Sequence, residues 1–540
     1  MKNLKIKLIY VPRIYPAKIN IMRDFGYSSK PPFIPPYGIS LLSSYLKSLG
    51  FKVKKDDLDI KAYVAGKKDE MKIFNKKEKI IKFLKTLKDD ELEETGEKIL
   101  KMTKIKGFDF FGLSIVDDMN FSAIASAIIL AKLIKEKTDA YVCLGGILTS
   151  RPFPEVELIK LPFIDFVVTG NHFAAADLLF SIENEKIPSH NLEEVICRED
   201  SIKRFKKINA PINKIPLLSR NWRINRSIEE IRPIPDFSDL PMDLYKFEIP
   251  ENRLGVAKKI LVLPYSFSFG CLNGCAFCPN SVFNVCKYKQ PQKVVEEIFS
   301  LKRKFKTKFF LFLNDNFNPS YNYALNLARS FIKEDLNIYW LDCINLRFLD
   351  KNLISILKES GGVEFIFGLE SGSQKILNLV EKKIVLQKAK ELIKFSYLQG
   401  VWNIVDLIVG LPHEREEDVK KTIKVVKELS PFVGWFQVSR FMLLKSKFLL
   451  YPEKYRICNI RDNVNSIADE RIFPRKFDEK NGLKWKEKRK QINTFYKKIL
   501  NVIKGKQEIQ PQYIFYLNDI LDREKYNISE LLLILKEEVG

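Results

Sequence analysis

Long apolar runs and an N-terminal signal core are missing from this sequence, and histidine and cysteine are scarce. The longest apolar run, 123–131, is ended by Lys132 and falls short of the about 18 residues that a transmembrane helix needs. The N-terminus, Met1–Lys7, holds three lysines and no apolar signal core. We therefore expect a cytoplasmic protein with no transmembrane segment.

Cysteine usage excludes a second class of protein. The chain has 8 cysteines in 540 residues, and three of them lie within eight positions, so they do not form the disulfide framework of a small secreted domain. With 540 residues and a hydrophobic content of 46%, the chain can bury two or three cores. The composition is typical of a multidomain intracellular enzyme.

Arginine-rich and aromatic-interleaved stretches are also absent. The net charge of +24 is carried mainly by lysines that are spread along the chain together with abundant isoleucine, phenylalanine and asparagine. An AT-rich genome encodes this composition, whereas a basic patch or a base-reading module would mark a nucleic-acid partner. We attribute the charge to compositional bias and do not expect nucleic acid as a partner.

Three cysteines carry the strongest functional signal. Cys271, Cys275 and Cys278 lie in the run FGCLNGCAFCPN, which spans 269–280. Spacings of three and two residues suit one face of a cubane iron-sulfur cluster, whereas zinc ribbons usually pair two two-residue knuckles. Three ligands leave one iron open to bind and reduce a small molecule. A structural zinc site is the alternative reading of these residues.

With Phe277 directly before the third cysteine, this run resembles the signature of the radical S-adenosylmethionine enzymes. The resemblance implies a 4Fe-4S cluster whose open iron binds the methionine amino and carboxylate groups of S-adenosylmethionine. One electron then cleaves the sulfonium to a 5'-deoxyadenosyl radical. The resemblance also implies that the backbone at Phe277 faces adenine, and that an electron donor such as flavodoxin or ferredoxin supplies the electron.

Residues 1–185 alternate short apolar strands with helices, which predicts an α/β, Rossmann-like domain with a parallel sheet. The ligand crevice of such a sheet lies at the carboxyl ends of its strands. The charged segment 67–104 interrupts the alternation, and we expect a solvated helical insertion there. The expected strands are Leu4–Val11, Phe51–Lys55, Phe108–Ile115, Tyr141–Leu144 and Ile164–Val168, and the expected helices are Gly38–Leu49 and Phe121–Lys135.

Several features of this domain resemble the cobalamin-binding type of radical S-adenosylmethionine enzyme. The proline-rich run 31–39 and the glycines that follow the strands have the order and spacing of that group. The resemblance implies that cobalamin is bound, and that Gly145, Gly146 and Gly170 lie against the corrinoid. The usual acidic residues after the last strand glycine are replaced by 171–173.

No Asp-x-His-x-x-Gly segment is present to supply a lower cobalt ligand. We therefore expect a corrinoid held without histidine. His172 follows the last strand, but a hydrogen-bonded structural role is the favoured interpretation for it.

The rest of the chain is predicted to form a linker, a partial barrel and a helical end. Proline-rich residues 186–255 are typical of a linker, and 234–241 resembles the segment that often precedes the barrel in this group. Residues 456–540 have helical periodicity. Residues 256–455 predict a (β/α)6 radical SAM barrel with strands at Lys259–Leu263, Phe309–Leu313, Ile338–Cys343, Gly362–Gly368, Trp402–Val409 and Gly434–Leu443.

Polar residues follow several of these barrel strands, where the active sites of such barrels lie. Glu370 and Ser371 come directly after a buried strand, and Glu370 can accept hydrogen bonds from ribose hydroxyls or an ammonium group. Asp315 follows the second strand, and Arg347 could pair with the methionine carboxylate. The resemblance implies that Asp315, Glu370, Ser371 and the turn 410–414 line the cosubstrate site. A turn or a helix cap is the structural alternative for Asp315, and surface placement is the alternative for Arg347. We also expect Ser371 or Ser373 to cap the helix that begins near Gln374, which does not compete with a role in the site.

The remaining cysteines discriminate among reactions. Related methylthiotransferases use three additional N-terminal cysteines for a second cluster, and this region offers only two, far apart. We predict a cobalamin-dependent methyltransferase that acts on an unactivated carbon or phosphinate of a small molecule, lipid or peptide. The alternative is a cobalamin-free member that catalyses cyclisation, carbon–carbon coupling or epimerisation, and a metal-containing RNA-binding protein is a remote third reading. We expect core or incidental roles for Cys143, Cys197, Cys286, Cys343 and Cys458.

Overall fold

The computed structural model describes the greater part of the chain. It divides into two compact units, one formed mainly by residues 35–245 and one mainly by 246–463 and 474–540. The described residues are 4–14, 33–115, 121–146, 158–168, 171–184, 195–198, 222–249, 258–282, 284–444, 446–461, 475–504, 514–515 and 518–519.

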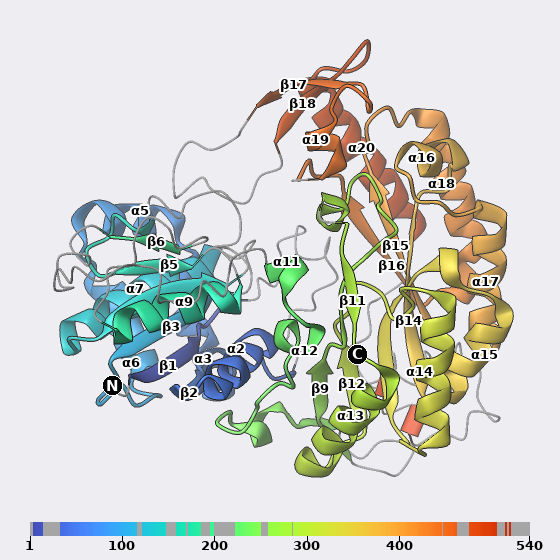
Figure 1. The fold of residues 1–540 in the computed structure, drawn as a ribbon. Helices are drawn as coiled ribbons and strands as arrows, with labels where there is room; N and C mark the ends of the chain where they lie inside the picture. Colours follow the sequence, from blue (N-terminus) through green and yellow to red (C-terminus); the bar gives the residue numbers. More distant parts are fainter. Residues whose placement is uncertain are drawn as a thin grey trace. The chain divides into compact units, whose positions relative to one another are not determined.

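The first unit is built on a six-stranded sheet with the order β2-β1-β3-β4-β5-β6 (Figure 1). The first five strands are parallel, as predicted, and β6 pairs antiparallel with β5. The chain adds β2 on one side of β1 and then adds β3, β4 and β5 on the other side, so the strand order reverses between β1 and β3. Ligands of doubly wound sheets bind at the carboxyl ends of the strands at such a switch point. The strands are β1 (Lys5–Tyr10), β2 (Lys52–Asp57), β3 (Phe110–Ile115), β4 (Tyr141–Gly146), β5 (Phe166–Val168) and β6 (Val195–Cys197).

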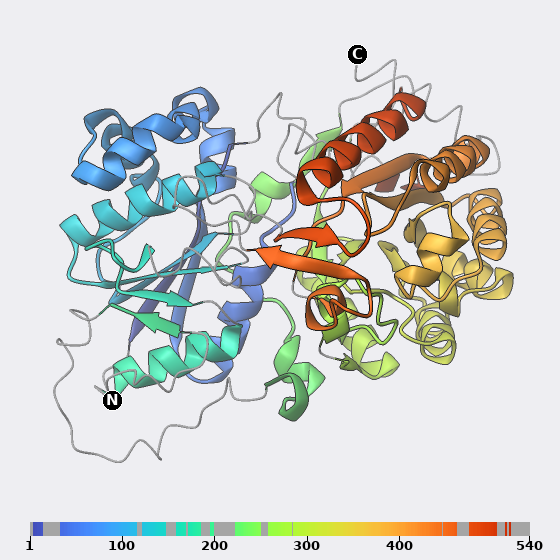
Figure 2. The same ribbon diagram turned by 90° about the horizontal axis from the view of Figure 1, so that it is seen from above.

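Helices cover both faces of this sheet (Figure 2). The apolar α7 packs with the insertion helices on one face, and α2 lies with α9 on the other. The insertion is helical as predicted, but it is less solvated than expected, because Phe74, Phe83 and Leu92 are buried in the core that includes α7. The helices are α2 (Tyr37–Ser48), α3 (Leu58–Val64), α4 (Lys68–Met71), η1 (Lys72–Asn75), α5 (Lys77–Thr86), α6 (Asp90–Leu100), α7 (Phe121–Lys137) and α9 (His172–Glu183).

The described part of the proline-rich segment, 222–249, packs on this unit up to Tyr245. Its Asp236 binds the fully buried Lys55, with 3.0 Å between Nζ and Oδ2. Its Tyr245 donates a hydrogen bond of 2.6 Å to Asp57. This stretch is therefore docked chain rather than free linker, and it holds α11 (Trp222–Asn225), α12 (Ile228–Ile231) and η4 (Met242–Tyr245).

The second unit contains a six-stranded sheet with the order β16-β15-β14-β13-β12-β9, in which every pairing is parallel. The first barrel strand begins at Val262, three residues later than predicted, because β8 (Lys258–Ile260) pairs antiparallel with β7 (Phe247–Ile249). The barrel strands are β9 (Val262–Tyr265), β12 (Phe309–Phe312), β13 (Tyr339–Ile344), β14 (Gly362–Glu370), β15 (Trp402–Val409) and β16 (Trp435–Arg440).

Helices line the outer side of this curved sheet (Figure 1). They have one apolar face, as on α14, where Ala324, Leu327 and Phe331 are buried at helical spacing. This alternation of strand and helix is the predicted partial barrel. The helices are α13 (Pro291–Phe305), α14 (Tyr321–Lys333), α15 (Lys351–Glu359), α16 (Gln374–Leu379), α17 (Leu386–Leu398) and α18 (Glu416–Leu429).

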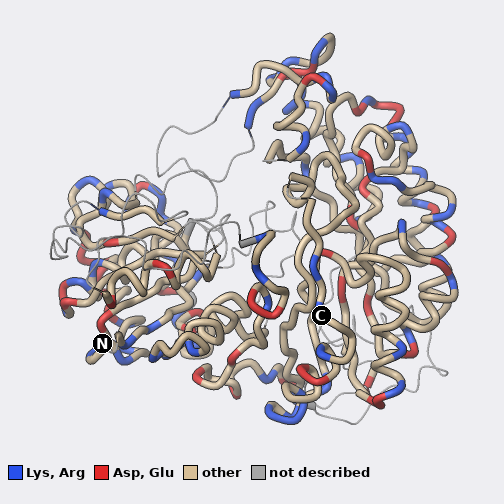
Figure 3. Tube along the Cα trace, viewed as in Figure 1, with Lys and Arg blue, Asp and Glu red and all other residues tan. Residues whose placement is uncertain are grey.

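The C-terminal part begins with a hairpin that the sequence did not predict, β17 (Ile457–Arg461) with β18 (Lys476–Glu479). The predicted helical character is carried by α20 (Trp485–Val502), which packs against α18 and β16. Lysine and arginine are interspersed with acidic residues in both units (Figure 3). No helix in the described ranges has the length and apolar character needed to cross a membrane.

Candidate functional site

The cysteine loop leaves the barrel after its first strand. Strand β10 (Ser268–Gly270) precedes the loop and pairs antiparallel with β11 (Cys286–Tyr288). Within the loop the N–H of Cys278 donates to the carbonyl of Cys275 at 3.1 Å, which closes a tight turn. Cys275 is buried, and Cys271 and Cys278 are half-buried. The three thiols therefore share one loop at the barrel mouth.

Asn273, which the sequence reasoning did not single out, binds two of these sulfurs. Its backbone N–H lies 3.4 Å from Cys271 Sγ, and its Nδ2 lies 3.0 Å from Cys275 Sγ. The same Nδ2 donates to the carbonyl of Lys382 at 3.2 Å. Such N–H donors stabilise negative charge on sulfur and orient metal ligands.

The thiols are close enough to influence one another electrostatically. Burial, and to a smaller extent the nearby Cys275 and Cys271, raise the pKa of the Cys278 thiol to about 12. Burial likewise raises the pKa of Cys271. Iron coordination would deprotonate such thiols outright. Three thiols on one loop, two of them with N–H donors on sulfur, fit three ligands of one cluster. Across the described ranges, no three His, Cys, Asp or Glu side chains converge as ligands of a single metal ion.

The end of β12 fastens the start of this loop. Asn314 Oδ1 accepts hydrogen bonds of 3.0 Å from the N–H groups of Phe267 and Ser268. Asp315 is exposed, and its Oδ2 accepts a hydrogen bond of 2.8 Å from the N–H of Gly270. The structure thus brings the predicted Asp315 next to the cysteine loop, where its observed contacts orient the loop backbone.

Glu370 lies at the end of β14 and pairs with Lys382, which the sequence reasoning missed. The distance from Lys382 Nζ to Glu370 Oε1 is 2.7 Å, and the side chains are 12% and 9% exposed. Burial acts to lower the pKa of Lys382, but the charges of Glu370 and Cys275 raise it well above its ordinary value. Lys382 therefore links the predicted carboxylate to the cysteine loop, whose Asn273 binds its carbonyl.

Two further carboxylates lie inside the barrel and were also missed. Asp406 on β15 has a buried Oδ1 with no hydrogen-bond partner in the described part of the chain. Burial, and then the charge of Glu370, raise the pKa of Asp406 to about 7. Asp342 on β13 accepts a hydrogen bond of 2.7 Å from Asn314 Nδ2, and burial raises its pKa to about 8. These acids give the barrel interior polar groups for a bound ligand.

The other predicted barrel residues have different surroundings. The Ser371 hydroxyl is fully buried and lies 3.4 Å from Thr422 Oγ1 of α18, so its observed partner is structural. Arg347 is exposed and stacks over Phe348, 4.7 Å from the ring centroid, without an ion pair to any described residue. The Phe277 ring is half-buried against an apolar cluster of the same unit.

The serine expected to cap α16 does not do so through its side chain. Ser373 is the N-cap residue, but its hydroxyl donates to Asp418 at 2.7 Å instead of accepting from the helix.

Two cysteines for which we expected core or incidental roles lie near the candidate site. Cys286 Sγ is 3.5 Å from the carbonyl of Gly270, and Cys343 lies on β13 within electrostatic reach of Asp342 and Asp406.

In the first unit, two of the three predicted glycines are described. Gly145 and Gly146 end β4, and a Cβ at Gly145 would meet no atom within 4 Å. Gly146 has a φ of 118°, and a Cβ there would lie 2.0 Å from the Ile115 carbonyl oxygen, so the position requires glycine. Gly170 lies outside the described residues.

His172 has the structural role that was expected for it. Its Nε2 lies 2.8 Å from the carbonyl of Glu230, and its ring packs edge-on against Tyr45. Burial lowers the pKa of His172 to about 3, so the ring is neutral and Nε2 donates the hydrogen bond.

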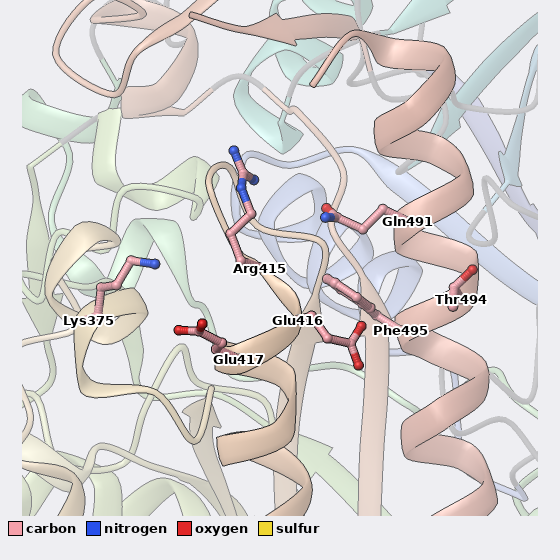
Figure 4. Close-up of a pocket in the computed structure, with 7 residues that line it drawn as sticks. All are labelled: Lys375, Arg415, Glu416, Glu417, Gln491, Thr494 and Phe495. Atoms are coloured by element: carbon pink, nitrogen blue, oxygen red, sulfur yellow. The ribbon is translucent and has the colours of Figure 1, made fainter. Parts of the chain in front are cut away.

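The turn 410–414 after β15 is held by its own residues and by the C-terminal part. Glu414 is 1% exposed and accepts a hydrogen bond of 2.5 Å from the N–H of Gly410. Burial raises the pKa of Glu414 to about 7. An open pocket of about 560 Å³ lies nearby between α16, α18 and α20 (Figure 4). None of the predicted site residues lines it; its lining is Lys375, Arg415, Glu416, Glu417, Gln491, Thr494 and Phe495.

Comparison with known families decides the nature of the barrel. Residues 265–426 match the radical SAM superfamily, and the match covers the cysteine loop and the strand ends described above. Residues 265–426 form a radical SAM domain. The predicted family is thereby confirmed for this part of the chain.

Several curated proteins match a longer part of this chain than the radical SAM domain. An uncharacterized methyltransferase of Pyrococcus horikoshii is 27% identical over 59% of this chain and 64% of its own length. The anaerobic magnesium-protoporphyrin IX monomethyl ester cyclase of Rubrivivax gelatinosus is 26% identical over 54% and 50%. The cytidylyl-2-hydroxyethylphosphonate methyltransferase of Streptomyces wedmorensis is 23% identical over 70% and 69%. The chain thus spans 64% and 50% of the first two relatives.

Solved structures match the fold of this chain over both units, the second of which contains the radical SAM domain. TsrM from Kitasatospora setae, a radical S-adenosylmethionine methyltransferase with cobalamin and a 4Fe-4S cluster bound, covers 100% of both chains at 15% identity and a TM-score of 0.60. OxsB, a cobalamin-dependent S-adenosylmethionine radical enzyme, covers 100% of this chain and 75% of its own at 12% identity and a TM-score of 0.59. The predicted fold, an N-terminal α/β unit followed by a partial barrel and a helical C-terminal part, is confirmed.

Proposed function

We propose that this protein is a cobalamin-dependent radical S-adenosylmethionine methyltransferase that acts on an unactivated carbon or phosphinate. The observation that carries the proposal is the loop with Cys271, Cys275 and Cys278 at the mouth of a radical SAM domain, beside the buried Glu370–Lys382 pair. When bound, a 4Fe-4S cluster supplies one-electron chemistry to S-adenosylmethionine and a corrinoid supplies methyl-group transfer.

The protein's own residues bind and orient the reactants in this proposal. Cys271, Cys275 and Cys278 hold the cluster, and Asn273 donates N–H groups to two of the sulfurs. Glu370 accepts hydrogen bonds from the ribose or the methionine ammonium of S-adenosylmethionine. Asp406 offers a second acceptor in the same interior, because its Oδ1 lacks a hydrogen-bond partner in the described part of the chain.

The adenine is proposed to lie between the backbone of the cysteine loop and the turn 410–414. Asp315 acts by holding Gly270 at the start of that loop, through the 2.8 Å hydrogen bond. Arg347 remains a proposed partner of the methionine carboxylate, although its observed stacking on Phe348 would have to change.

The first unit is the proposed corrinoid domain. Its sheet order places a switch point between β1 and β3, and Gly145 and Gly146 end the neighbouring strand β4 without side chains. His172 is occupied by the Glu230 carbonyl, so we propose that no histidine lies beneath the cobalt. The likeness to TsrM and OxsB supports this assignment through the fold.

A second candidate function has its own support. The cyclases of Rubrivivax gelatinosus and Cereibacter sphaeroides are among the curated relatives, at 26% and 25% identity. Their names give a cyclisation, which supports the alternative in which the radical leads to cyclisation, coupling or epimerisation instead of methyl transfer. Either reaction needs an external one-electron donor such as flavodoxin or ferredoxin, and we propose a cytoplasmic location in which such donors stay reduced.

Anaerobic reconstitution tests the proposed cluster. The wild-type chain should hold about four irons and cleave S-adenosylmethionine reductively. Cys271→Ala, Cys275→Ala and Cys278→Ala should each abolish cleavage, whereas Cys458→Ala on β17 should leave it intact. Full cleavage by any of the three loop variants contradicts the proposed ligand set. Transfer of a methyl group to product in the presence of cobalamin separates the methyltransferase from the cobalamin-free alternative.

A further inference from the structure

The turn that follows β15 is connected to the C-terminal part by a buried ion pair. Lys488 of α20 and Glu479 of β18 have fully buried side chains, with 2.9 Å between Nζ and Oε1. Lys488 Nζ also donates to the carbonyl of Leu411 at 2.8 Å. Glu479 Oε1 also accepts from the N–H of His413 at 2.7 Å. The pair thus binds the turn at the Leu411 carbonyl and at the His413 N–H.

The hydrogen-bonding capacity of this pair is fully used. The third donor of the Lys488 ammonium meets Gln491 Oε1 at 3.0 Å. Glu479 Oε2 accepts from Arg415 Nη2 at 2.6 Å and from the N–H of Leu483 at 3.2 Å. Complete satisfaction of this kind makes a buried polar network rigid and specific in geometry.

Apolar packing adds a second contact between α20 and the turn. Gly410 has a φ of 86°, and a Cβ there would lie 2.2 Å from Ile492 Cγ1. The helix therefore packs directly on the glycine backbone at the start of the turn. His413 also has a left-handed φ of 59°, which is costly for a residue other than glycine. Such a conformation persists only where surrounding contacts impose it.

The outer side of the same arrangement is the open pocket between α18 and α20 (Figure 4). Arg415, directly before α18, and Gln491 of α20 both line it, and both bind the buried pair. These contacts thus connect the surface pocket, through Glu479 and Lys488, to the turn at the carboxyl end of β15.

Burying an ion pair costs the desolvation free energy of both charges. Desolvation of two charges can exceed their attraction, and well-packed apolar residues of the same volume often give equal or greater stability. Packing alone would therefore not require Lys488 and Glu479. Their bonds to the Leu411 carbonyl and the His413 N–H instead fix the positions of two specific backbone groups.

We propose that Glu479 and Lys488 are positioning residues for the cosubstrate. The C-terminal hairpin and α20 form a clamp that holds the turn 410–414 in the geometry that binds the adenosine part of S-adenosylmethionine. This inference rests on the proposed function, and it gives the C-terminal part a role in that function.

The test compares ligand binding with folding in the reconstituted full-length protein. The central variant is Glu479→Gln with Lys488→Met, because it removes both charges of the buried pair together, and the other cationic partner of Glu479, Arg415, is 38% exposed. Lys490→Met is the matched control, since Lys490 is exposed on the same helix. Ile492→Ala loosens the turn without changing any charge. Iron content and the thermal unfolding midpoint are recorded for each protein, and equilibrium dialysis measures S-adenosylmethionine, 5'-deoxyadenosine and methionine.

We expect the double variant to keep its iron and its unfolding midpoint but to bind S-adenosylmethionine and 5'-deoxyadenosine about tenfold more weakly, the equivalent of one lost hydrogen bond. Methionine affinity should stay the same, and Lys490→Met should behave as wild type. Ile492→Ala should weaken the same two ligands, which keeps the test informative if the double variant fails to fold.

Two results would overturn the inference. One is 5'-deoxyadenosine affinity within twofold of wild type in a folded double variant or in Ile492→Ala. The other is an equal loss of methionine affinity, which would show a general disturbance of the barrel. Failure of the wild-type protein to bind S-adenosylmethionine at all would instead refute the proposed function.

Discussion

The ammonium of Lys382 lies 2.7 Å from the carboxylate of Glu370, and both side chains are largely buried at the mouth of the barrel. The acid that the sequence marked for cosubstrate binding is thus already compensated by a cation of the same unit. Lys382 also reaches the cysteine loop, because its carbonyl accepts a hydrogen bond from Asn273. A ligand that binds Glu370 therefore meets a carboxylate that Lys382 holds in place.

Glu370→Gln is expected to weaken S-adenosylmethionine binding without loss of the cluster. Replacing the carboxylate removes a charge-assisted hydrogen bond, which costs about 1.5–3 kcal/mol or roughly ten- to a hundredfold in affinity. Equilibrium dialysis against the oxidised protein measures the change. Glu359→Gln, at the exposed end of α15, is the control. Unchanged affinity, or loss of iron, would show that Glu370 has another role.

Asn273→Ala should make the cluster easier to remove. The side chain donates to Cys275 Sγ and to the Lys382 carbonyl, and loss of such an outer contact typically costs about ten- to a hundredfold in metal affinity. The rate and extent of iron release to a chelator measure this. Asn352→Ala, whose side chain is exposed on α15, should release iron as the wild type does. Equal retention in both variants would contradict the role given to Asn273.

The strands and the cysteine loop could be predicted because their signals are local. Largely apolar runs of five to ten residues marked every strand of the barrel, and the spacing of Cys271, Cys275 and Cys278 marked the loop. The first barrel strand was placed too early because Lys259 and Ile260 lie directly before its apolar residues, although they pair with β7. The hairpin of β17 and β18 was missed because both strands are short and β18 is mostly charged.

The missed site residues share a different cause. Lys382, Asp406 and Lys488 are charged, and a charge in a sequence favours an exposed position unless its partner is known. Each has its charged neighbours on another element, such as Glu370 for Lys382 and Asp406, and Glu479 for Lys488. Only tertiary structure brings these partners together. The partner of Ser371, Thr422, likewise comes from another element, α18.

The stability of the cluster-free protein should fall as the pH rises from about 4 to 8. Burial raises the pKa of Asp342 to about 8 and that of Asp406 to about 7, against about 3.9 in an unfolded chain. The native state therefore keeps protons that the unfolded state releases. The stabilisation is complete below the unfolded pKa and is lost as the pH rises through the folded values.

Each such group contributes at most about 1.4 kcal/mol per pH unit in this window. Asp342→Asn, which is neutral at every pH, should flatten the dependence of the unfolding free energy on pH. Urea unfolding of wild type and variant between pH 5 and about 8.5 measures the difference. Asp335→Asn, on the surface after α14, should keep the wild-type slope. Identical slopes for the wild type and Asp342→Asn would show that Asp342 ionises normally.

Corrinoid binding is expected to depend on Gly145 and not on His172. A Cβ at Gly145 would meet no atom of the described residues within 4 Å, so we expect Gly145→Leu to fold and to project its side chain into the crevice at the end of β4. Its affinity for hydroxocobalamin should fall at least about tenfold, since a misplaced side chain destabilises a well-packed interface.

His172→Asn should bind cobalamin as the wild type does, because the His172 ring is already held by the Glu230 carbonyl. Absorption and electron paramagnetic resonance of the bound cobalt should show no imidazole ligand in either protein. An imidazole signal lost in His172→Asn would refute the ligand-free assignment, and wild-type affinity in Gly145→Leu would remove β4 from the corrinoid site.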